Sequence, residues 1–244
     1  MTVLVVGATG ATGRWLVPHL LERGVQVRAI VRSPDRLPPA VAQHERLSLI
    51  RGAVLDFSDA ELTDHVAGCA AVASCLGHNL SWKGVYGPPR RLVTDATRRL
   101  CAAIKAHAPT SPVKFVLMNT TGNRNRDLNE RISLAERGVI GLLRLLLPPQ
   151  VDNEQAADYL RTQVGQDDEA IEWVAVRPDA LINADQVTPY EVVPSPTRSA
   201  IFNPGKISRI NVAHFMATLI TDAATWDRWK GQMPVLYSQP PANA

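Results

Sequence analysis

The chain has 244 residues, of which 45% are hydrophobic and 20% are charged, so it can form one large domain with a substantial core. Its formal net charge of +3 and its dispersed basic residues give no indication of binding to nucleic acid or to a membrane surface. Because no apolar stretch is long enough to span a bilayer and a strand is predicted from residue 3, we expect a cytoplasmic protein without a signal peptide.

The three cysteines, Cys69, Cys75 and Cys101, include no CxxC pair. An odd number of cysteines without metal-ligand spacing is typical of buried thiols in a reducing compartment. We therefore predict no metal site.

Residues 3–6 form a short, entirely apolar run of the kind that makes a strand buried on both faces. Spaced glycines follow this run, and a helix is predicted over residues 14–23. In this setting Gly7 permits a sharp turn, Gly10 lets the backbone approach a pyrophosphate, and Gly13 lets the helix pack closely on the strand. Glycine triplets also occur in ordinary turns, but the flanking strand and helix favour a dinucleotide site. Its predicted contacts in this loop are Gly7, Thr9, Gly10, Ala11, Thr12 and Gly13.

A second strand is predicted over residues 25–31, and Arg32 follows it directly. At this position the fold distinguishes its cofactors, because an acidic residue binds the 2′-hydroxyl of NAD and a basic residue accommodates the 2′-phosphate of NADP. Arg36 lies close by in the sequence. The alternative is a solvated arginine at a strand end. We predict that NADP(H) is preferred over NAD(H), with Arg32 and Arg36 as contacts.

The rest of the chain alternates between strands and helices. This alternation predicts an α/β fold with a Rossmann-type doubly wound parallel sheet, in a single domain over residues 1–244. The core would end near residue 180, and a small C-terminal substrate lobe would cover residues 181–244. Further strands are predicted at 47–52, 70–76, 113–118 and 172–178, and further helices at 57–67, 92–107, 153–161 and 207–221.

Several candidate contacts follow the predicted strands, where ligands bind in open α/β sheets. Asp56 either touches the adenine amine or caps the next helix, for which Ser58 is also a plausible N-cap. Leu76 and Gly77 follow the fourth strand, and Thr120 follows the fifth, where its hydroxyl could instead satisfy the turn.

Residues 123–150 interrupt the alternation with a polar stretch, an apolar run at 142–147 and then two prolines. We predict an inserted helical segment that either covers the site or forms an oligomer contact, so a monomer and a homodimer both remain open. The proline-rich stretch 185–203 is predicted to be a substrate loop.

Three stretches, residues 5–13, 31–37 and 174–178, resemble the atypical short-chain dehydrogenase/reductases of the NAD(P)H-binding, NmrA-like type. Within this group the chain looks most similar to the biliverdin-IXβ/flavin reductase branch. Residues 207–213 are similar to the pattern ISRxDVA of these proteins, with Asn211 where aspartate is usual. The resemblance implies a dinucleotide-dependent oxidoreductase.

Typical short-chain dehydrogenases use a tyrosine and, four residues later, a lysine, but the corresponding positions here are Pro149 and Asn153. Tyr159 comes too late and is predicted to pack in a helix. The family's Ser/Thr position matches Thr120, with Thr121 as second choice. By resemblance, we assign the catalytic roles to Thr120 and Asn153.

These departures leave two hypotheses. The first is an NADPH-dependent reductase of a flavin, quinone or similar small aromatic acceptor, which needs little acid catalysis because solvent can supply the proton. The second is an NmrA-like redox sensor that binds the dinucleotide without catalysis and acts through a protein partner. His78 and His107 are predicted to be surface residues.

Overall fold

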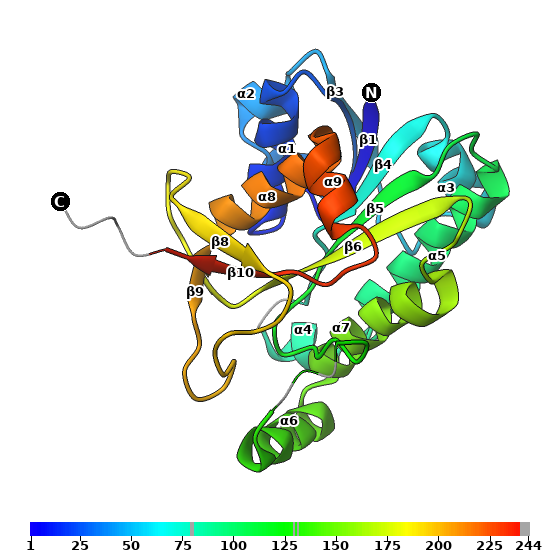
Figure 1. Ribbon diagram of the computed structural model, residues 1–244. Helices are drawn as coiled ribbons and strands as arrows, with labels where there is room; N and C mark the ends of the chain where they lie inside the picture. Colours follow the sequence, from blue (N-terminus) through cyan, green and yellow to red (C-terminus); the bar gives the residue numbers. More distant parts are fainter. Residues whose placement is uncertain (79–80, 129, 131, 240–244) are drawn as a thin grey trace.

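The computed structural model describes residues 1–78, 81–128, 130 and 132–239. Its centre is an eight-stranded sheet with the strand order β3-β2-β1-β4-β5-β6-β10-β8 (Figure 1). All neighbouring pairs are parallel except β10 and β8, which pair antiparallel at one edge. The strands are β1 (Thr2–Val6), β2 (Gln26–Val31), β3 (Leu47–Arg51), β4 (Cys69–Ser74), β5 (Val113–Met118), β6 (Ile171–Pro178), β8 (Tyr190–Val193) and β10 (Val235–Ser238). Two short strands, β7 (Ala180–Ile182) and β9 (Lys206–Ser208), form a separate parallel pair.

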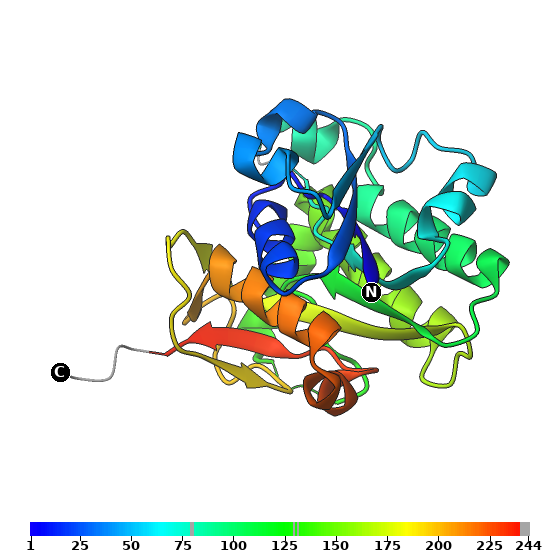
Figure 2. The same cartoon turned by 90° about the horizontal axis from the view of Figure 1, so that it is seen from above.

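Helices cover both faces of the sheet (Figure 2). One layer contains α1 (Gly13–Glu22), α8 (Arg209–Thr221) and α9 (Ala223–Trp229), and the other contains α3 (Asp59–Val66), α5 (Leu92–His107) and α7 (Pro148–Tyr159). The remaining helices are α2 (Pro39–Ala42), α4 (Trp82–Tyr86) and α6 (Leu134–Leu146), and a π-helical turn (Leu160–Val164) continues α7. Within the described ranges, no helix is long and apolar enough to cross a bilayer.

The apolar character of β1 follows from this layering. Val3 and Val5 pack into the core under α1 and α8, whereas Leu4 and Val6 pack into the core under α3, α5 and α7. Successive side chains of a strand point to opposite faces, so a strand covered on both sides favours apolar residues at every position. This explains the continuous apolar run that begins the sequence.

The predicted Rossmann-type parallel sheet is confirmed. All six predicted strands occur with small shifts at their ends, and α5 and β5 have the predicted bounds. The three cysteines are buried free thiols, as predicted. Burial raises the pKa of the Cys75 thiol to about 12, which keeps it protonated at neutral pH.

The C-terminal part differs from the prediction. The segment 185–203, predicted to be a loop, contains β8, and the helix predicted from residue 207 begins at Arg209 because β9 precedes it. Neither α9 nor β10 was predicted. These strands have only three or four residues, too few to show the alternation that marks a longer strand.

The prolines near residue 148 also have a second role. They stop the apolar run, since α6 ends at Leu146, but they also begin α7 rather than separate it from a later helix. Proline is tolerated in the first turn because the N–H groups there have no partner within the helix. The predicted helix over 153–161 is therefore the later part of α7.

Arg177, near the end of β6, is completely buried and uses all its N–H groups. Its guanidinium forms a bidentate ion pair with the buried Glu130 carboxylate, at 2.7 and 3.0 Å. The remaining donors bind the backbone carbonyls of Met233, Asn123 and Pro194. Because a buried charge is tolerated only when it is paired and hydrogen-bonded, this site fixes four chain segments relative to one another.

Arg177→Met should lower the free energy of unfolding by about 3–5 kcal/mol, because the Glu130 carboxylate would remain buried without its partner. Adding Glu130→Gln should restore part of that loss, since the double variant buries no charge at this site. Urea denaturation at neutral pH measures both effects. A single variant as stable as the parent protein would contradict this account.

Candidate functional site

A cavity of about 490 Å³ lies at the carboxyl ends of β1, β2, β3 and β4. This volume is in the range of small-molecule sites, about 300–1,000 Å³. The structure brings together here most of the predicted cofactor contacts: Gly7, Thr9, Gly10, Ala11, Arg32, Arg36, Asp56, Leu76 and Gly77. Thr12 and Gly13 do not line the cavity, because both lie buried at the start of α1.

Two of the glycines are required by packing within the protein. Gly7 has a φ of +77°, and a Cβ there would lie 2.6 Å from the carbonyl carbon and oxygen of Cys75. A Cβ on Gly13 would lie 2.2 Å from the Gly7 carbonyl oxygen. At Gly10, a Cβ would come to 3.1 Å from the same oxygen and would occupy the surface of the cavity. The loop therefore forms a cradle whose floor is backbone.

The N-terminus of α1 adjoins this cradle and is not capped by a side chain. Thr12 occupies the N-cap position but makes no side-chain cap hydrogen bond. In α3 and α6, by contrast, Ser58 and Ser133 accept from the first-turn backbone in complete capping boxes. The N–H groups of Arg14 and Trp15 donate to the carbonyls of Gly10 and Thr12, but the positive end of the helix dipole still suits a phosphate group.

The cavity is also lined by two basic residues that follow β2. Arg32 and Arg36 line it and are exposed, and neither forms an ion pair with any residue in the described ranges. Asp56 lines the cavity as well, whereas the N-cap of α3 is Ser58, so the capping alternative for Asp56 is excluded. A glycine cradle, a helix N-terminus and a basic pair together suit a dinucleotide.

Thr120 and Asn153, the predicted catalytic pair, lie outside this cavity and next to each other. Asn119 joins them, because its Nδ2 donates to the Asn153 carbonyl at 2.8 Å and its Oδ1 accepts from the Thr120 N–H at 2.9 Å. The Thr120 hydroxyl accepts from the Gly122 N–H at 3.3 Å. Asn153 donates through Nδ2 to the Pro149 carbonyl, one turn earlier in α7, at 3.0 Å.

Two other hydroxyl residues have structural contacts. The Thr121 hydroxyl donates to Asp179 Oδ1 at 3.1 Å in a buried position. Tyr159 packs on the core below α5, with the Arg98 guanidinium 5.5 Å from the centre of its ring. Burial raises the pKa of the Tyr159 phenol above its usual value, which makes it a poorer proton donor. The predicted packing role of Tyr159 is confirmed.

The prediction that His78 is a surface residue is wrong. Its side chain is only 5% exposed, and its Nε2 lies 2.7 Å from Oδ2 of Asp152, which is 1% exposed. Its Nδ1 lies 3.1 Å from the Gly84 carbonyl oxygen. Both ring nitrogens therefore face acceptors, an arrangement that favours the doubly protonated ring. His107, by contrast, is exposed as predicted.

Asp152 connects this histidine to α5. Its carboxylate accepts from the backbone N–H groups of Val93 and Thr94, at 2.8 and 2.9 Å, and thereby caps the start of α5. Burial on its own would raise the pKa of Asp152, but the hydrogen bonds from His78, Thr94 and Val93 together lower it. The hydrogen bond to Asp152 raises the pKa of His78.

These contacts have only weak indications in the sequence. His78 directly follows the predicted cofactor residue Gly77, and Asp152 directly precedes Asn153, but 74 positions separate the partners. The arginines before and within α6 are a clearer indication of charge in this part of the chain.

Replacing His78 with glutamine should lower the free energy of unfolding by about 1–3 kcal/mol near pH 6, where the charged hydrogen bond is fully formed. Because the folded-state pKa of His78 is raised, its contribution is complete below its ordinary pKa of 6.5 and is lost as the pH rises through the raised value. As the pH rises through that value, the parent protein should lose this contribution, so its stability should approach that of the variant. Urea titrations from about pH 5 to about pH 9 measure the difference. His107→Gln is the matched control, and the same effect in both variants would contradict the assignment.

Comparison with known proteins agrees with this geometry. The sequence profile of the NAD(P)H-binding family matches residues 7–223. Cinnamoyl-CoA reductase 1 of Arabidopsis thaliana is 32% identical over 133 residues, which are 52% of this chain but only 36% of the plant enzyme. The chain thus matches about a third of the length of that relative.

Solved structures share the fold over nearly the whole chain. A short-chain dehydrogenase/reductase of Veillonella parvula, solved in complex with NADP, has a TM-score of 0.69 and 17% identity over 100% of this chain and 96% of that chain. A candidate NADH-flavin reductase of Streptococcus pneumoniae has a TM-score of 0.67 and 17% identity over 98% of this chain and 100% of that chain. Since the family profile covers most of its length, the chain belongs to the NAD(P)H-binding family.

Proposed function

We propose that the protein is an NADPH-dependent reductase that transfers hydride to a flavin, a quinone or a similar conjugated acceptor. The observation that carries the NADPH part is the basic pair at the cavity rim, Arg32 and Arg36, which face the position of the adenosine ribose in this fold. The candidate NADH-flavin reductase with the same fold supports the choice of acceptor.

The proposal assigns a role to each of the chain's own groups. The Gly7–Gly13 loop and the first turn of α1 hold the pyrophosphate, and Arg32 and Arg36 pair with the ribose phosphate. Asp56 accepts from the adenine amine. Thr120, at the end of β5, orients the nicotinamide amide or the acceptor, and Asn153 holds a ribose hydroxyl or a water molecule.

The bound dinucleotide supplies a hydride, that is, two electrons and one proton. A conjugated ring accepts the hydride at carbon or nitrogen and spreads the resulting charge, so the second proton can come from solvent. The positions of the usual tyrosine and lysine are Pro149 and Asn153 here, which is compatible with an acceptor that needs orientation more than acid catalysis.

Arg32→Ala should raise the KM for NADPH by about 10–100-fold, because a charged hydrogen bond contributes about 1.5–3 kcal/mol. The KM for NADH should change much less. Steady-state kinetics with each cofactor measure the difference, and Arg51→Ala, an exposed arginine at the end of β3 outside the cavity lining, is the matched control. Equal losses for both cofactors would refute the assignment of Arg32.

The protein should oxidise NADPH when flavin mononucleotide or a simple quinone is present, at a higher kcat/KM than for NADH. Absorbance of the reduced nicotinamide measures turnover, and calorimetry measures binding of each cofactor separately. Tight cofactor binding without turnover on flavins, quinones and carbonyl compounds would refute the reductase and favour a redox sensor.

A further inference from the structure

A second cavity, of about 370 Å³, lies beside the connection between β5 and α6 and is lined mainly by arginines. Its polar walls are the side chains of Arg124, Arg126, Arg137 and Arg144, and its apolar walls are Ile132 and Ile140. No carboxylate belongs to its lining as the described residues define it. We call this space the arginine cavity.

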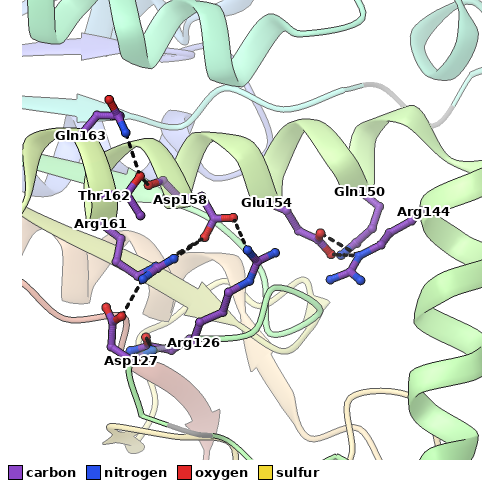
Figure 3. Close-up of polar contacts among 10 residues, drawn as sticks. Arg126, Asp127, Arg144, Gln150, Glu154, Asp158, Arg161, Thr162 and Gln163 are labelled. Atoms are coloured by element: carbon purple, nitrogen blue, oxygen red, sulfur yellow. Dashed lines mark hydrogen bonds and ion pairs between the residues drawn. The ribbon is translucent and has the colours of Figure 1, made fainter.

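Two of the four arginines are already paired, and their partners lie on α7 (Figure 3). Arg126 forms an ion pair with Asp158 at 3.3 Å, and Arg144 donates through Nε to the Glu154 carboxylate at 2.8 Å. Glu154 also accepts from Gln150 at 2.9 Å, so its charge is shared. These contacts fix the two guanidinium groups in place.

The other two arginines have no carboxylate partner in the described part of the chain. Arg137 is exposed on α6, and Arg124 is half-buried. The Nε–H of Arg124 is shielded from solvent and has no hydrogen-bond acceptor among the described residues. A buried donor without an acceptor destabilises the folded protein, so a ligand oxygen would remove a defect that the free protein carries.

The arginine cavity lies beside the turn that carries Thr120. Gly122 forms part of its wall, and the Gly122 N–H donates to the hydroxyl of Thr120. Thr120, to which we assign the orientation of the nicotinamide or the acceptor, is therefore one hydrogen bond away from the wall of the arginine cavity. Ile132 and Ile140 offer an apolar surface beside the charges.

We propose that the arginine cavity binds an anionic group of the acceptor, a carboxylate or a phosphate. The proposal rests on the proposed reductase function for its link to turnover, but the binding itself does not require turnover. Planar guanidinium groups match both anions through paired N–H donors. The substrate class is thus a conjugated ring that carries an acidic side chain, with the acid in the arginine cavity and the ring toward Thr120.

Two pairs of acceptors with the same ring test this proposal. Flavin mononucleotide and riboflavin differ by a phosphate, and a naphthoquinone propionate and its methyl ester differ by a carboxylate charge. The charged member of at least one pair should have a KM about 10-fold lower, and the pair that shows the difference identifies the anion. Equal KM values within both pairs would overturn the proposal while leaving the reductase function intact.

Arg124→Gln and Arg137→Gln should each remove most of the difference, raising the KM of the charged acceptor about 10-fold and leaving that of the neutral acceptor unchanged. Arg228→Gln, on α9, makes the same change in net charge outside the cavity and should have no effect. If the control variant has the same effect as the other two, the preference comes from overall charge and the proposal fails.

A binding measurement separates this proposal from the reductase function. Flavin mononucleotide and riboflavin are titrated by fluorescence into the protein saturated with NADP⁺, which blocks the dinucleotide cavity. Weaker binding of the mononucleotide to Arg124→Gln, with no loss of thermal stability, supports the arginine cavity even if no acceptor is reduced. A lower melting temperature with unchanged binding would instead assign Arg124 a structural role and overturn the proposal.

Discussion

The position of the β5–α6 connection depends on one buried guanidinium. The burial of Arg177 is tolerated only if every one of its N–H donors finds an acceptor. The chain meets this requirement with Glu130 and three backbone carbonyls, which come from the β5–α6 connection and from the segments before β10 and after β8. Segments without regular structure thereby acquire fixed positions beside the sheet.

The two ends of the candidate site are built by different physical means. At the dinucleotide end, backbone packs directly against backbone, as the contact between Gly7 and Cys75 shows. Beside α7, charged side chains span larger gaps, and the carboxylates of this helix pair with arginines from neighbouring segments (Figure 3).

His78 and Asp152 join these two ends. His78 follows the chain segment that lines the dinucleotide cavity, and Asp152 lies in α7 beside Asn153 while its carboxylate caps α5. A movement of α7 would therefore pull on His78, which directly follows the cavity-lining residue Gly77. The connection is the hydrogen bond between the His78 ring and the Asp152 carboxylate, and a hydrogen bond to a charged group is stronger than one between neutral groups.

The sequence predicted the features that depend on neighbours in the chain. The strands covered on both faces, the amphipathic α5 and the glycine loop each have a local pattern that the residue types reveal. The contacts that complete the site have no such pattern, because Arg177 and Glu130 are 47 positions apart and His78 and Asp152 are 74 apart. The short strands β8 and β9 form because β10 and β7 offer them an edge, which no local sequence specifies.

The packing of the glycine loop affects how related sequences should be compared. Gly7 and Gly13 are held in place by atoms of the protein itself, so a descendant that no longer bound a dinucleotide would still need both in order to fold. The presence of both glycines in a related sequence therefore indicates the same loop packing and does not by itself indicate dinucleotide binding. At position 10, which lines the cavity, a methyl group would have less steric conflict with the protein. Replacement of Gly10 should therefore be the first change in sequence that follows a loss of binding.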